Sequence, residues 1–194
     1  MTGVVKKVLR LFPNPPTEIN GERQKGNLFI NALKQWTGKS SATVIFDSTV
    51  DEFTNHGLFN KIKGKHNVAF VGFTTEGDVF GGFYSVAVTN FYDFFHDPNL
   101  FAFSFESHGR CKTPQRFVVK QELRHLARVR FFKGDDFGQF VQFDGPGWFY
   151  FGNEKSRTYC HLLSAGFEGI KDTTLTGTTG VKYTCYRLIA ILLE

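Results

Sequence analysis

Apolar and polar residues alternate with a period of two over most of the chain after Asn67. Short runs rich in Phe, Val, Tyr and Ile are separated by turn residues such as Lys133-Gly134-Asp135-Asp136. Such alternation is typical of strands with one buried face, and clusters of Gly, Asp and Pro are typical of the turns between strands. The pattern predicts strands at 67–74, 78–88, 100–105, 115–120, 127–132, 138–143, 148–151, 158–163 and 183–193.

The number of short strands determines the expected fold class. Many strands at regular spacing with few helices predict a mainly β (α+β) fold, a two-sheet antiparallel β-sandwich with a few flanking helices. The final run, Tyr183–Leu193, is apolar enough to be a central strand buried on both faces. The 24 phenylalanines, spread through the period-two runs, are expected to pack between the sheets.

The chain divides into an N-terminal segment, 1–40, and a sandwich domain, 41–194. In the first, Pro13-Asn14-Pro15-Pro16 reads as an extended linker, and Gly26–Trp36 has apolar residues at helical spacing. We expect this amphipathic helix to dock on the domain, although a partner groove is an alternative. The domain is expected to open with a strand at Ser41–Phe46 and a helix within Asp51–Lys63.

The hairpin Asn67–Tyr84 carries a resemblance to a known family. Its turn and return strand, Gly77-Asp78-Val79-Phe80-Gly81-Gly82-Phe83, resemble the "DGxVFGxF" signature of the TLDc domain. We also expect Gly77 to take a positive φ, and Gly81-Gly82 to allow another backbone close to the strand. Further segments similar to the family pattern are Thr43–Asp47, Asp51–Lys63, Leu100–Phe105 and Gly145–Gly152.

The resemblance implies a β-sandwich flanked by helices with no established catalytic mechanism. TLDc domains are associated with protection against oxidative damage, and several act by binding the V-type proton ATPase. This chain departs from the family pattern before the strand at 100–105, where Asp97-Pro98-Asn99 replaces a Gly-Glu pair.

Catalytic and metal-binding signatures are weak. Asp93-Phe94-Phe95-His96-Asp97 contains a carboxylate and an imidazole for acid–base chemistry, but a turn-capping role for Asp97 fits better in a loop before Pro98. Cys160 and His161 are adjacent and would point to opposite faces of a strand, so they are not expected to bind one ion. The sequence therefore predicts a protein that is not an enzyme and has no metal or cofactor.

Compartment is indicated by cysteine usage and hydropathy. The three widely spaced cysteines, Cys111, Cys160 and Cys185, do not suggest a disulfide framework. We therefore expect a cytosolic or nuclear setting. The sequence contains no apolar run of about 18 residues, so no membrane insertion is expected.

Positive charge is concentrated in two places. Residues 1–40 contain seven Lys/Arg against two Glu, and residues 106–133 contain eight Lys/Arg against two Glu. The second set, called here the basic block, is predicted to bind an acidic partner or nucleic acid, with an ordinary solvated face as the alternative. Its members are Arg110, Lys112, Arg116, Lys120, Arg124, Arg128, Arg130 and Lys133.

The secondary structure of the basic block has two interpretations. On a helix, Arg116, Lys120, Arg124 and Arg128 would form one cationic stripe. In strands, Arg128 and Arg130 would face water while Val129 and Phe131 face the core. The TLDc resemblance favours strands.

Two functional hypotheses follow. The first is a non-enzymatic TLDc-type interaction module that acts in the oxidative-stress response through protein contacts, with the V-type ATPase as a partner that the resemblance suggests. The second is a DNA-binding, stress-linked regulator that uses the basic block and the basic N-terminus.

Overall fold

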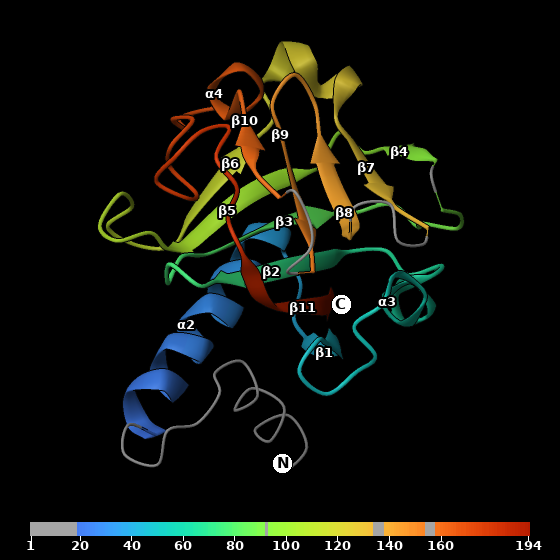
Figure 1. Ribbon diagram of the computed structural model, residues 1–194, viewed down its shortest axis with the longest axis horizontal. Helices are drawn as coiled ribbons and strands as arrows, with labels where there is room; N and C mark the ends of the chain where they lie inside the picture. The colour runs from blue at the N-terminus through green and yellow to red at the C-terminus, as the bar shows by residue number, and fades with distance from the viewer. Residues whose placement is uncertain (1–18, 92, 134–137, 154–157) are drawn as a thin grey trace.

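The computed structural model describes residues 19–91, 93–133, 138–153 and 158–194. The Pro-rich linker expected at residues 13–16 lies outside these ranges. Two antiparallel sheets pack face to face, with few helices around them, so the sandwich expected from the sequence is confirmed (Figure 1). None of the described helices combines the length and hydropathy that a membrane crossing requires.

The larger sheet has six strands in the order β1-β11-β2-β3-β5-β6. The C-terminal strand β11 lies between β1 and β2, so the chain ends inside the sheet. Its alternate residues enter the cores on both faces, as its uninterrupted apolar pattern predicts. The strands are β1 (Ala42–Asp47), β2 (Val68–Thr74), β3 (Val79–Tyr84), β5 (Phe101–Glu106), β6 (Gln115–Val118) and β11 (Cys185–Leu193).

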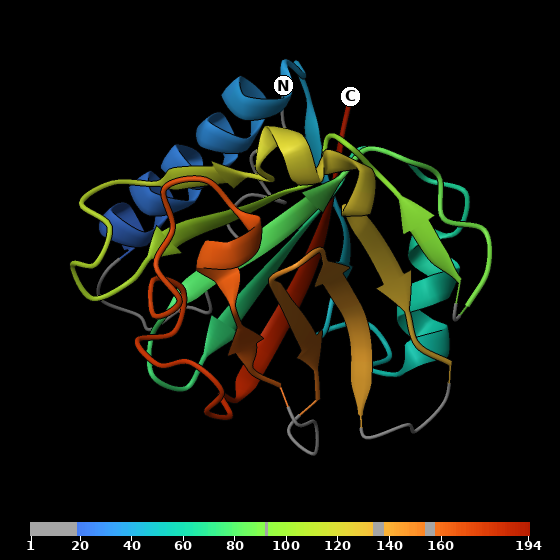
Figure 2. The ribbon, with the colours of Figure 1, turned by 90° about the horizontal axis from the view of Figure 1, so that it is seen from above.

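The smaller sheet has five strands in the order β10-β9-β8-β7-β4. One face of this sheet packs on the larger sheet. The other face is turned outward and is not covered by a described helix (Figure 2). The strands are β4 (Phe94–His96), β7 (Arg128–Phe131), β8 (Gln139–Asp144), β9 (Trp148–Gly152) and β10 (Cys160–His161).

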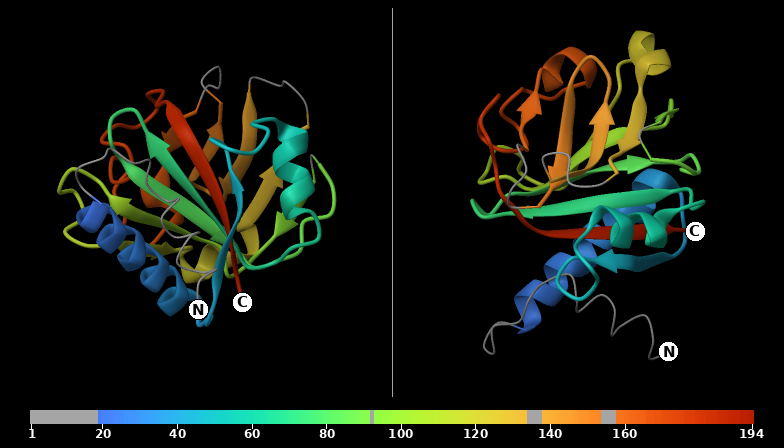
Figure 3. Two further views of the ribbon diagram at one scale, coloured as in Figure 1. Left: turned by 90° about the horizontal axis from the view of Figure 1, so that it is seen from below. Right: turned by 45° about the vertical axis from the view of Figure 1, so that its right-hand side comes forward.

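Helix α2 (Ile19–Thr37) packs on the outer face of the six-stranded sheet, over β5 (Figure 3). Phe29 stacks on Phe105 with ring centroids 4.3 Å apart, and Leu33 is fully buried. The helix thus docks on the domain through the apolar face that its sequence pattern predicts. It begins at Ile19 instead of Gly26, and Leu28 remains exposed.

The other described helices are short and lie at the margins of the sandwich. Helix α3 begins after Thr54, whose hydroxyl accepts a hydrogen bond from the Gly57 amide, and it falls within the range expected for it. These helices are α3 (Asn55–Ile62), the 3-10 helix η2 (Gln121–Leu126) and α4 (Leu163–Gly166).

Phenyl rings of the small sheet lie directly on glycines of the large sheet. A Cβ at Gly72 would stand 2.2 Å from the Phe151 ring, and one at Gly82 would stand 2.5 Å from the Phe143 ring. The close neighbour of Gly82 is therefore a ring from the opposite sheet. At Gly81 a Cβ would overlap the Phe70 carbonyl oxygen, so the close backbone approach expected for this glycine pair is confirmed there. Gly77 has a φ of +87°, which confirms its expected role in the turn.

Two sequence expectations need correction. Residues Asp93–Asp97 were expected to form a loop, but Phe94–His96 are strand β4, paired with β7. The strand expected at 115–120 ends at Val118, and the turn of 3-10 helix that follows was not predicted. Both elements are too short to produce a periodic signal.

A buried ion pair joins the first and last strands. The Arg187 guanidinium donates to both carboxylate oxygens of Asp47, at 2.7 and 3.1 Å, and each side chain is only 3% exposed. Burial opposes ionisation of Asp47, but hydrogen bonds from Arg187 and Thr49 outweigh it and lower its pKa below the usual 3.8.

We expect Gly82→Ala to destabilise the protein by about 2 kcal/mol, because the new methyl group would overlap the Phe143 ring. Chemical denaturation measures this change. Adding Phe143→Leu should cost less in the Gly82→Ala background than in the wild type, because the shorter side chain relieves the overlap. Gly145→Ala, whose Cβ would meet only a carbonyl oxygen at 3.6 Å, is the matched control. Equal effects at Gly82 and Gly145 would contradict this account of the packing.

We expect Asp47→Asn to destabilise the protein at pH 7 by about 3 to 5 kcal/mol, because Arg187 would remain buried without its counter-charge. The folded-state pKa of Asp47 is lowered, so the stability from this pair is fully present above pH 3.8 and is lost as the pH falls through the folded value. Denaturation at several pH values should show a smaller acid-induced loss in the variant. Glu106→Gln, which breaks the exposed Lys25–Glu106 pair, should cost less than about 1 kcal/mol.

Candidate interaction surface

The basic block does not form one helix. Arg116 lies in β6, Lys120 precedes η2, Arg124 lies within η2 and Arg128 lies in β7. The predicted helix with a single cationic stripe is therefore wrong, because the chain changes direction at the 3-10 turn. The block is divided among several parts of the molecule.

The strand interpretation is confirmed for β7. Val129 and Phe131 are buried between the sheets, whereas Arg128 and Arg130 lie on the outer face. Phe94 of the neighbouring strand β4 contacts both arginines. Its ring centroid is 4.0 Å from the Arg128 guanidinium carbon and 4.9 Å from that of Arg130. The two guanidiniums are therefore held in place by an aromatic ring.

The carboxylate of Asp144 lies beside Arg128. Asp144 of β8 is 5% exposed and accepts a hydrogen bond from Arg128 Nε at 2.6 Å. Because the geometry is close and the carboxylate is buried, this pair holds Arg128 against the sheet more firmly than an exposed ion pair would.

An aromatic cluster occupies the other half of the same face. The Trp148 ring lies 5.0 Å from the rings of Tyr150, Tyr159 and His161, measured between centroids. Tyr150 is mostly buried, whereas the other three are partly exposed. Together with the arginines these side chains form what we call the outer platform, which consists of Phe94, Arg128, Arg130, Trp148, Tyr150, Tyr159 and His161.

The rest of the basic block lies elsewhere. Arg116 and Arg124 line a cavity beside the end of α2. Lys120 Nζ donates to the Ser164 carbonyl at 2.9 Å, and Lys112 is exposed between β5 and β6. Lys133 follows β7. Only Arg128 and Arg130 of the eight predicted residues belong to the outer platform.

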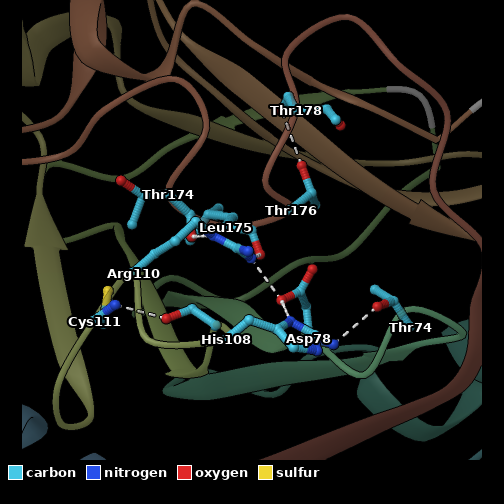
Figure 4. Close-up of polar contacts among 10 residues, drawn as sticks. Thr74, Asp78, His108, Arg110, Cys111, Thr174, Leu175, Thr176 and Thr178 are labelled. Atoms are coloured by element: carbon cyan, nitrogen blue, oxygen red, sulfur yellow. Dashed lines mark hydrogen bonds and ion pairs between the residues drawn. The ribbon is translucent and has the colours of Figure 1, made fainter.

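Arg110 has a structural role at the opposite end of β3 from the cavity (Figure 4). Its Nη2 donates to Asp78 Oδ1 at 2.5 Å and to the Leu175 carbonyl at 3.2 Å, and its Nε donates to the Thr174 carbonyl at 3.0 Å. It thereby joins the β2–β3 turn to the segment after α4. These contacts remove Arg110 from the partner-binding set that the sequence suggested.

His108 shares the same carboxylate. Its Nδ1 lies 2.9 Å from Asp78 Oδ1, and its side chain is 56% exposed. A carboxylate that orients an imidazole is a component of acid–base sites. Among the described residues, however, no hydroxyl or thiol is hydrogen-bonded to this imidazole, so the pair lacks the nucleophile of a catalytic triad.

The other candidate acid–base and metal-binding residues are accounted for by turn capping and by packing. Asp97 is fully buried and accepts hydrogen bonds from the Asn99 amide and from Ser85, which confirms its turn-capping role. Cys160 is buried between the sheets while His161 lies on the outer platform, so the two do point to opposite faces. In the part of the chain that the structure describes, no cluster of three His, Cys, Asp or Glu side chains could hold a metal.

Sequence reasoning missed the aromatic half of the outer platform. The signal was present in Trp148–Gly152, where alternation places Trp148 and Tyr150 on the face opposite to Phe149 and Phe151. The core prediction covered the phenylalanines as a class and made no separate assignment for Trp148. It is correct for the phenylalanines of β8 and β9 and wrong for Phe94, which is 42% exposed.

The cysteines should differ in reactivity. Burial raises the pKa of Cys160 and of Cys185 to about 12, and both are fully enclosed, whereas Cys111 is partly exposed. At pH 8 a pKa near 12 leaves about one thiol in ten thousand as the reactive thiolate. A thiol-reactive dye should therefore label only Cys111 in the native protein and all three cysteines after unfolding. Rapid labelling of a Cys111→Ser variant would contradict this.

No family model matches the chain, and no match was found among curated proteins.

Proposed function

We propose that this chain is a non-enzymatic interaction module that binds an acidic surface of a protein partner through the outer platform. The observation that carries the proposal is the gathering of arginines and aromatic rings on a sheet face that no described helix covers (Figure 2). Arg, Trp and Tyr are the residues that most often dominate binding energy between proteins.

The arrangement of the outer platform favours binding in two ways. Phe94 and Asp144 already hold the arginines in place, so little side-chain entropy remains to be lost when a partner binds. The outer platform presents two guanidiniums side by side, and the carboxylate of Asp144 fixes the position of the Arg128 guanidinium. A partner that presents carboxylates would complement the two guanidiniums.

The biological role proposed for this module is the oxidative-stress response. Support comes from the resemblance of the β2–β3 hairpin to the TLDc signature, and the V-type ATPase is a candidate partner on the same ground. Two of the three cysteines are buried with raised pKa values, which favours protection through binding over direct consumption of peroxide.

Single-stranded nucleic acid is a second candidate partner. Aromatic side chains beside arginines on an open sheet face can stack with unpaired bases, and Trp148, Tyr159 and Arg130 have this arrangement. Duplex DNA is less favoured, because the basic block contains no α-helix that could enter the major groove.

The proposal is tested by complementation in cells that lack the protein. Wild-type protein should restore resistance to peroxide, whereas Trp148→Ala combined with Arg130→Gln should not, because both halves of the outer platform are lost. Tyr186→Ala, which removes an aromatic side chain that is 51% exposed on the other sheet, is the matched control and should restore resistance. Purified wild-type protein should not turn over peroxide.

Full complementation by the double variant would overturn the assignment of the binding surface to the outer platform, and rapid peroxide turnover by pure protein would overturn the non-enzymatic role.

Anisotropy of labelled oligothymidylate at several salt concentrations tests single-stranded nucleic acid, the second candidate partner. A slope of log K against log[salt] of about −0.7 for each phosphate contacted, reduced by Arg130→Gln, would favour nucleic acid.

A further inference from the structure

A cavity of about 370 Å³ lies where the end of α2 meets the ends of β3, β5 and β6. Its volume falls within the range of about 300 to 1,000 Å³ that is usual for ligand sites. None of its lining residues belongs to the outer platform, so the inference drawn from it does not depend on the function proposed above. The lining residues are Trp36, Thr37, Asn67, Phe83, Ser85, Pro98, Asn99, Leu100, Phe101, Arg116, Val118 and Arg124.

The floor of the cavity is aromatic. Phe83 and Phe101 stack with their centroids 4.8 Å apart, and Trp36 meets Phe101 edge-on at 6.2 Å. These rings belong to the apolar layer between α2 and the six-stranded sheet, which ends at this point. An apolar side chain placed here would extend that layer, and its surface would be removed from contact with water.

Two arginines complete the wall. Arg116 Nη1 donates to the Trp36 carbonyl at 2.8 Å, and its guanidinium carbon lies 5.5 Å from the Phe101 ring centroid. The Arg124 guanidinium has no hydrogen-bond or ion-pair partner among the described residues. Among the lining residues that the structure describes there is no carboxylate, so these residues do not compensate the formal charge of two.

Two side-chain amides also line the cavity. Asn99 Nδ2 donates to Ser85 Oγ at 3.2 Å, and Asn67 Nδ2 lies 2.8 Å from a ring nitrogen of His66. Within the described part of the chain, neither amide oxygen has a partner. An amide oxygen can accept a hydrogen bond from a peptide N–H, which favours a peptide over an inorganic anion as the occupant.

We propose that this cavity binds an acidic peptide segment that carries one large apolar side chain. The apolar side chain packs on Trp36 and Phe101, and the neighbouring carboxylates of the peptide pair with Arg116 and Arg124. The rings supply apolar contact and the guanidiniums select for negative charge. A strongly hydrophobic but neutral segment would leave both arginines unpaired.

The test uses the peptide Gly-Asp-Phe-Asp-Asp-Gly labelled with fluorescein. The chain contains two tryptophans, so Trp148→Phe leaves Trp36 as the single tryptophan. Peptide binding should change the Trp36 emission in this variant and should raise the anisotropy of the label. The peptide with its phenylalanine replaced by alanine, and the peptide with lysines in place of aspartates, should each bind at least tenfold more weakly.

Substitutions locate the site. Arg124→Gln should weaken binding about tenfold, as expected for the loss of a charge-assisted hydrogen bond. Arg116→Gln should weaken it by at least as much. Lys63→Gln removes an exposed positive charge at the end of α3 and is the matched control, so it should leave the affinity unchanged. Thermal unfolding of each variant checks that it folds.

Three results would overturn the proposal. The first is an unchanged Trp36 emission at millimolar peptide, and the second is equal affinity in the wild type and Arg124→Gln. The third is tighter binding of oligothymidylate that displaces the peptide and depends on Arg124, which would reassign the cavity to nucleic acid. Trp148→Ala with Arg130→Gln should leave peptide binding intact, so failure of the outer platform and failure of the cavity can be told apart.

Discussion

The close contact between phenyl rings and glycines is the constraint on which the sandwich depends. Phe151 lies on Gly72 and Phe143 lies on Gly82, at distances that leave no room for a Cβ. Two sheets can pack this tightly around large rings only where one partner has no side chain. The hairpin β2–β3 therefore serves as the surface against which the small sheet is seated.

This packing determines where functional groups can lie. The inner faces of both sheets are filled by aromatic side chains, and α2 packs on the outer face of the large sheet over β5. Two surfaces of the described residues combine arginines with aromatic rings: the outer platform on the small sheet and the cavity beside the end of α2. The outer platform lies on the strand face opposite to the core, whereas the rings of the cavity belong to the buried layer under α2.

The local pattern of apolar and polar residues predicted most strands, but it did not predict strand β4 or the start of helix α2. The strands from Val68 to Tyr84 and β11 have long or uninterrupted apolar runs, so their type and approximate bounds could be predicted. Strand β4 has three residues, and its pairing with β7 joins segments more than thirty positions apart in the sequence. Helix α2 extends seven positions before its apolar face becomes visible in the sequence.

By itself the sequence determined the fold class, the two-faced burial of β11 and the lack of a recognisable catalytic motif, because these follow from local periodicity and spacing. Only the tertiary structure decided what the basic block does. Arg110 is bound to Asp78, 32 positions away, while Arg124 and Arg128 lie on different surfaces although they are four positions apart. The partners of a charged side chain depend on which strands become neighbours, and the sequence does not encode that pairing locally.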